Sequence, residues 1–182
     1  MRNLPVLLAV PDLGAVEYGL AKLSNLRVFR AASAATGEEL YTCSGPSYTV
    51  GLLRDVNPGP AGSSPEHLTV VGTRLFFFAA DGVHGFELWV SDGTAAGTLR
   101  IASLPASGSV APEILSLTAV GSCRVYFATF GGPFGSELWR SDGTLAGTAV
   151  VVDLYPGVAG GSPYGLTAYR GRGRNLAVAD RR

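Results

Sequence analysis

Residues 87–98 read Glu87-Leu88-Trp89-Val90-Ser91-Asp92-Gly93-Thr94-Ala95-Ala96-Gly97-Thr98. The pattern returns as Glu137-Leu138-Trp139-Arg140-Ser141-Asp142-Gly143-Thr144-Leu145-Ala146-Gly147-Thr148. A degenerate copy precedes both, as Glu39-Leu40-Tyr41-Thr42-Cys43-Ser44-Gly45-Pro46. A period of about 50 residues indicates a tandem array in which each unit must stack on a neighbour to bury its apolar face.

Four strand-like segments recur in each period. In the best-preserved repeat they are His67–Val71, Leu75–Ala80, the Glu-Leu-Trp strand and Thr98–Ser103. Gly72-Thr73 has the length and composition of a tight hairpin turn. Four antiparallel strands in this period are typical of a propeller blade. The sequence therefore predicts an all-β fold of propeller-type repeats with four-stranded antiparallel blades.

Superposing the copies predicts a single repeat domain over residues 1–182 with about 3.75 units. It consists of a degenerate partial unit (1–38), unit 1 (39–86), unit 2 (87–136) and unit 3 (137–182), which has a truncated basic end. We expect Leu4–Val10 to be a strand and Asn175–Asp180 to be the last one. Two arrangements remain open: a four-bladed ring that lacks one strand, or an arc cut from a longer ring. An open arc would expose unpaired edges at Leu4–Val10 and Asn175–Ala179 and would favour self-association or a partner with further repeats.

The side-chain pattern also predicts which faces are covered. Leu75–Ala80 is apolar throughout, as expected for a strand packed on both faces. In the Glu-Leu-Trp strand, Glu87 and Trp89 share one face and Leu88 and Val90 share the other. We therefore expect the Leu-Trp pairs 88–89 and 138–139 to be largely buried between or within blades.

The repeated polar residues favour a structural interpretation. An Asp carboxylate in Ser-Asp-Gly-Thr can accept hydrogen bonds from N–H groups two residues on, and the following glycine tolerates positive φ. The structural motif comprises Glu87, Leu88, Trp89, Asp92, Gly93, Thr94, Glu137, Leu138, Trp139, Asp142, Gly143 and Thr144. The alternative is a calcium site formed by the turn aspartates Asp81, Asp92, Asp142 and Asp153, although they are not clustered in a calcium-loop pattern.

No catalytic residue, metal site or cofactor is predicted. His67 and His84 each lack a counterpart in the next repeat, and no phosphate-binding or nucleophile-elbow motif occurs. Cys43 and Cys123 fall at different places in the repeat, so the sequence does not decide whether they pair.

Composition limits the remaining functions. The chain is 47% hydrophobic and 15% charged, with no formal net charge, which argues against disorder. No apolar run reaches the length of a membrane span, and the short N-terminal apolar run lacks a clear signal-peptide cleavage site. The arginines within residues 170–182 could suggest nucleic-acid binding, but Arg170-Gly171-Arg172-Gly173-Arg174 falls where a hairpin is expected and has no interleaved aromatics.

The chain resembles the bacterial ELWxxDGT-repeat proteins in residues 87–167, where the motif above is followed by Val-Val-Asp-Leu-x-Pro-Gly and Ser-Pro-x-x-Leu-Thr. The resemblance becomes degenerate toward residue 39, where Tyr41 replaces the tryptophan and Ser44 the aspartate. It implies a tandemly repeated, propeller-like protein that is secreted or at the cell surface, and it implies no reaction.

We therefore expect a non-catalytic structural or interaction module with a protein or carbohydrate partner. The alternative is a glycan-acting or other hydrolytic enzyme with its site at the propeller channel.

Overall fold

The structure is a computed structural model that describes residues 20–47, 49–102, 104, 113–130, 136–152, 164–171 and 174–180. The described residues contain no helix and form three four-stranded antiparallel sheets and one two-stranded sheet. The all-β prediction is thus confirmed. Leu4–Val10 lies outside the described residues, so its predicted strand is not addressed. Among the described residues, no helix could serve as a membrane span.

Consecutive strands pair within each sheet. The first sheet contains β1 (Ala21–Leu23), β2 (Leu26–Ser33), β3 (Gly37–Ser44) and β4 (Thr49–Arg54). The second contains β5 (Glu66–Val71), β6 (Arg74–Ala80), β7 (Phe86–Ser91) and β8 (Leu99–Ala102). The third contains β9 (Glu113–Val120), β10 (Arg124–Phe130), β11 (Leu138–Ser141) and β12 (Ala149–Val152). The fourth contains β13 (Tyr164–Gly171) and β14 (Arg174–Asp180).

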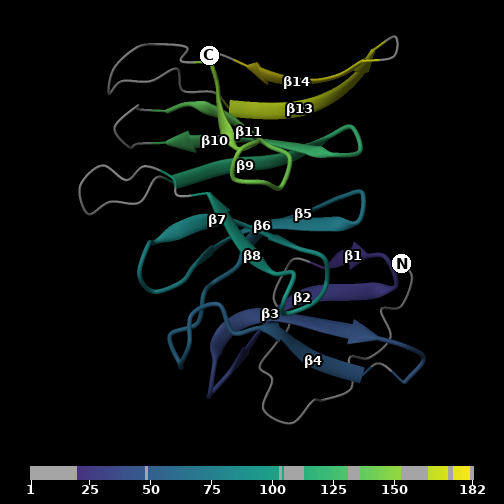
Figure 1. Ribbon diagram of the computed structural model, residues 1–182, viewed down its shortest axis with the longest axis vertical. Coiled ribbons are helices and arrows are strands. Elements are labelled where there is room, and N and C mark those ends of the chain that lie inside the picture. The colour runs from purple at the N-terminus through teal and green to yellow at the C-terminus, as the bar shows by residue number, and fades with distance from the viewer. Residues whose placement is uncertain are drawn as a thin grey trace.

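The sheets follow one another from one end of the molecule to the other, with the fourth sheet opposite the first (Figure 1). Their first strands make a continuous row, because β1 contacts β5, β5 contacts β9 and β9 contacts β13. The boundaries of the sequence repeat differ from those of the sheets, because the Glu-Leu-Trp motif lies in the third strand of a sheet. Each predicted unit therefore joins two strands of one sheet to two strands of the next.

Turn chemistry accounts for the hairpins. Gly72 has φ +60°, and Val71 pairs with Arg74 on either side of the predicted Gly72-Thr73 turn. Gly171 pairs with Arg174, so the arginine-glycine segment joins two strands, as the repeat predicted.

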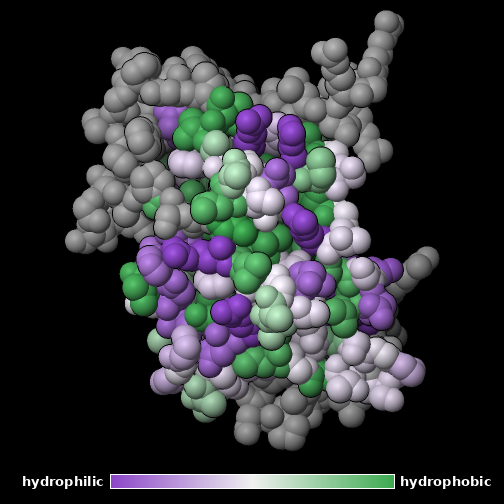
Figure 2. Space-filling model, in the orientation of Figure 1, coloured by the Kyte–Doolittle hydropathy of each residue, from purple (hydrophilic) through white to green (hydrophobic). Residues whose placement is uncertain are grey.

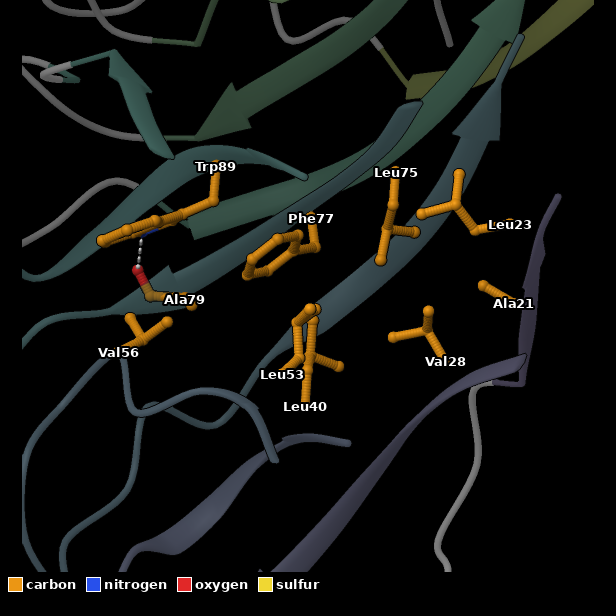
Figure 3. Packing of buried hydrophobic residues seen from close by; sticks show 10 residues of the cluster. All are labelled: Ala21, Leu23, Val28, Leu40, Leu53, Val56, Leu75, Phe77, Ala79 and Trp89. Atoms are coloured by element: carbon orange, nitrogen blue, oxygen red, sulfur yellow. Dashed lines mark hydrogen bonds between the residues drawn. The ribbon is translucent and has the colours of Figure 1, made fainter. Parts of the chain in front are cut away.

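The core lies between the sheets. Side chains of β6 alternate between two clusters: Leu75, Phe77 and Ala79 pack toward the first sheet, whereas Phe76 and Phe78 pack toward the third. All five are at most 1% exposed, as expected for a strand covered on both faces. Figure 3 shows the first cluster, in which side chains of β6 and β7 meet those of the first sheet.

Burial of the two Leu-Trp pairs differs. Leu88 and Trp89 are buried, as predicted. Leu138 and Trp139 are only partly buried, so this copy is covered less completely than the first. The residues are the same, which means that the difference comes from the neighbouring sheet.

Candidate functional site

The Ser-Asp-Gly-Thr turns between the third and fourth strands are closed by side-chain hydrogen bonds. Asp92 Oδ1 accepts from the backbone N–H of Thr94 at 2.9 Å and from its hydroxyl at 2.7 Å. Asp142 accepts the same two hydrogen bonds from Thr144, at 3.0 and 2.7 Å. These hydrogen bonds lower the pKa of both carboxyls. In each copy the aspartate organises its own turn.

These turns also contact the preceding sheet. Gly93 has φ +95°, and a Cβ there would lie against the Leu26 side chain at the β1–β2 hairpin. Gly143 has φ +88° and approaches Arg74 at the β5–β6 hairpin in the same way, while Arg74 Nη1 donates to the Asp142 carbonyl at 3.1 Å. The glycine of the motif therefore serves both the turn conformation and the contact between sheets.

The aromatic residue of the motif stacks on the second strand of its own sheet. Trp89 lies over Phe77 with ring centroids 6.4 Å apart, and Trp139 lies over Phe127 at 6.0 Å. The indole N–H of Trp89 donates to the Ala79 carbonyl at 3.2 Å. Burial with a satisfied indole is the usual structural role of tryptophan.

Sequence reasoning gave the motif glutamate a strand face but no role. Glu39, Glu87 and Glu137 are 0%, 3% and 1% exposed. Glu87 Oε2 accepts from the Leu104 N–H at 2.7 Å, beyond the end of β8. Glu39 similarly accepts from the Asn57 N–H at 3.0 Å and from the Ser63 hydroxyl at 2.6 Å. Two of the buried carboxylates therefore hold the chain that leaves the fourth strand.

Burial perturbs these carboxyls. It raises the pKa of Glu87 to about 7, against the opposing effect of the Leu104 hydrogen bond. It raises the pKa of Glu39 as well. The sequence signal for this role is an acid that recurs beside Leu-Trp in an otherwise apolar strand.

One polar pair breaks the repeat. Asp81 Oδ2 lies 2.7 Å from His84 Nδ1, and Asp81 Oδ1 accepts from the N–H groups of Val83 and His84 at 2.9 and 2.8 Å. Burial opposes ionisation of Asp81, but these interactions outweigh it and lower the pKa to about 2. In the part of the chain that is described, no serine, threonine or cysteine side chain hydrogen-bonds to His84. Within the described ranges, the pair therefore does not form the nucleophile–base hydrogen bond that nucleophilic catalysis uses.

The candidate calcium ligands are not brought together. Asp81 precedes β7 and Asp92 follows it, so the two lie at opposite ends of one strand. Asp142 belongs to the next sheet, and Asp153 lies outside the described residues. Within the described ranges, no group of three or more His, Cys, Asp or Glu side chains could hold a metal ion.

The remaining candidates are separate from one another. His67 packs edge-on against Phe78, with ring centroids 6.3 Å apart. Cys43 is buried and Cys123 is exposed, and both are free thiols.

An open pocket of about 340 Å³ lies where the second and third sheets meet, lined in part by Arg74, Asp142, Thr73, Ser122 and Thr144. The Asp142 carboxylate, the Thr144 hydroxyl and Arg74 Nη1 in this pocket are already engaged in the turn and the sheet contact described above.

Comparisons with models of known protein families, with curated proteins and with solved structures give no match.

Proposed function

We propose that the chain is a non-catalytic structural or interaction module. One observation carries this proposal: the polar side chains that recur between repeats are engaged in building the fold. Glu39 and Glu87 hold the chain beyond the fourth strand, and Asp92 and Asp142 close turns. Catalytic sites instead need polar groups that converge on a substrate.

The proposed architecture is a propeller-type arc of about 3.75 units. It is supported by the order of the strands within each sheet and by the row formed by β1, β5, β9 and β13. In a propeller, first strands line the central axis and later strands lie progressively farther out. This arrangement would place the fourth strands at the periphery.

The proposed partner is a protein or a carbohydrate, outside the cell or at its surface. The location and the bacterial origin rest on the resemblance to ELWxxDGT-repeat proteins. Figure 2 shows hydrophobic residues interspersed with hydrophilic ones on the face it presents.

The alternative is a glycan-acting or other hydrolytic enzyme. The Asp81–His84 pair favours it, because this pair is not repeated and therefore is not needed by every unit. In this alternative, His84 would exchange a proton with substrate while Asp81 orients the imidazole.

Hydrolysis of chromogenic glycosides, esters and phosphate esters by the purified chain would test the proposal. We expect no turnover above that of the His84→Ala variant, which removes the imidazole from an exposed turn. Turnover that is lost in both His84→Ala and Asp81→Asn, while the far-UV circular dichroism spectrum is retained, would overturn the proposal in favour of the enzyme.

A further inference from the structure

The third sheet has an apolar face that its neighbour covers only in part. The leucine of Glu-Leu faces the following sheet in each repeat. Leu40 is 2% exposed and Leu88 is 0% exposed, because a four-stranded sheet lies over each. Leu138 occupies the same position and is only partly buried.

The fourth strands repeat this contrast. Each has a register shift opposite the Leu-aromatic step. In the first two sheets the residue at that bulge packs in the cluster shared with the following sheet. The bulge residue is Leu53 in β4, Ile101 in β8 and Val151 in β12. Leu53 and Ile101 are 4% and 6% exposed, whereas Val151 is 39% exposed.

The uncovered part lies beyond β14. Ala128 in the second strand of the third sheet is 0% exposed, and β13 contacts both β9 and β10. The two-stranded sheet therefore covers the inner half of the face. On the third and fourth strands, Leu138 is only partly covered and Val151 is exposed. We call these two residues the outer shelf.

The same region has an open sheet edge. In the first three sheets, the second strand pairs with a strand on each side. Among the described residues, β14 pairs with β13 alone. An unpaired edge offers backbone N–H and C=O groups to an added strand.

The two complete interfaces show what covers such a shelf. Trp89 shares a core cluster with Leu40 and Leu53, the equivalents of the outer shelf in the first sheet (Figure 3). Trp139 likewise packs with the cluster that contains Leu88 and Ile101. In both cases, the covering group is the tryptophan of the next Glu-Leu-Trp strand.

An arginine begins the second strand of both the second and the third sheets. Arg74, the first residue of β6, donates to the Asp142 carbonyl in the turn of the following sheet. Arg124 is the first residue of β10 and is exposed. It holds the position in β10 that Arg74 holds in β6, and its charge also acts on Asp142 of its own sheet.

We propose that the outer shelf and the edge of β14 bind a strand–turn–strand segment of a partner that carries the Glu-Leu-Trp-x-Ser-Asp-Gly-Thr pattern. The segment adds to β14 as a third strand and places its tryptophan over Leu138 and Val151. This inference rests on the proposed interaction module and names its partner. Main-chain hydrogen bonds would supply affinity, and the tryptophan and the turn would supply specificity.

The test uses a fluorescein-labelled peptide of residues 87–102 of this chain, titrated with the 182-residue chain and followed by fluorescence anisotropy. We expect saturable binding that weakens at least tenfold with a Trp89→Ala peptide or with a Val151→Glu protein. Leu52→Glu is the matched control, because Leu52 is also 39% exposed on a fourth strand but belongs to the first sheet, whereas the outer shelf is in the third. Circular dichroism and urea unfolding would establish that both variants fold.

Absence of saturable binding, or equal loss with Val151→Glu and Leu52→Glu, would overturn the inference. Sedimentation velocity tests the other candidate occupant of the outer shelf, a second copy of this chain. Self-association that only Val151→Glu abolishes, without peptide binding, would assign the shelf to a second copy and would also overturn it. Catalytic turnover would refute the proposed non-catalytic module without changing the peptide result, so the two failures are distinguishable.

Discussion

Replacing Glu87 with glutamine would remove a buried negative charge while keeping an oxygen for the hydrogen bond from Leu104. Burial raises the pKa of Glu87 from 4.5 to about 7. Each pKa unit corresponds to about 1.4 kcal/mol, so the ionised carboxylate lowers the free energy of unfolding by about 3 kcal/mol at most.

The sign of the pH dependence follows from proton binding. Between pH 4.5 and about 7, the folded protein holds the Glu87 proton more tightly than the unfolded chain does. The stabilising contribution is therefore fully present below pH 4.5 and is lost as the pH rises through about 7. Glu39 contributes in the same direction, because burial also raises its pKa.

Urea unfolding followed by tryptophan fluorescence, between pH 4 and pH 8.5, measures this effect. We expect wild type and Glu87→Gln to agree within about 1 kcal/mol at the acidic end, since both side chains are then neutral. At pH 8 the variant should be more stable, by up to about 3 kcal/mol. Glu39 is present in both proteins, so their difference isolates Glu87.

Glu113→Gln is the control, because Glu113 is exposed at the start of β9. Its stability should follow the wild-type pH profile. A Glu87→Gln profile parallel to wild type, or a variant that loses stability above pH 7, would refute the assignment of Glu87 as a buried, destabilising carboxylate when ionised.

Three further outcomes are expected. Leu88→Ala should lower the free energy of unfolding by about 3 kcal/mol and Leu138→Ala by about half as much, because only Leu88 is fully covered; equal losses in urea unfolding would contradict this. Gly97→Ala should destabilise the chain because its Cβ would collide with the Asp92 carboxylate. A double-mutant cycle with Asp92→Ala should show coupling of at least about 0.5 kcal/mol, and simple additivity would exclude the collision. Of the two free thiols, the exposed Cys123 should react with Ellman's reagent in the native protein and the other only in urea; two fast-reacting native thiols would be inconsistent with the structure.

The sequence predicted the sheet faces because these depend on local alternation. Three consecutive phenylalanines, Phe76 to Phe78, cannot all point the same way in a strand, so both faces of β6 must be apolar. The opposite directions of Leu88 and Trp89 follow from the same rule. The structure places these residues in two separate core clusters.

The role of Glu87 was missed because its partner is distant in sequence. The Leu104 N–H lies beyond a turn and a further strand, and no local period connects it to the carboxylate. An acid at a strand end is usually solvent-exposed. Only the repeated Glu-Leu step indicated a shared structural role.

The sequence of the motif alone does not determine how deeply its residues are buried. The Glu-Leu-Trp and Ser-Asp-Gly-Thr residues are identical at both copies, and their turns form the same hydrogen bonds. Leu88 is nevertheless fully buried, and Leu138 is not. The motif fixes the turn and the direction of each side chain, whereas the neighbouring sheet determines how much apolar area is removed from water. Since burial stabilises in proportion to that area, equivalent residues in this array contribute unequally to folding, and the least covered copy has the most to gain from a partner.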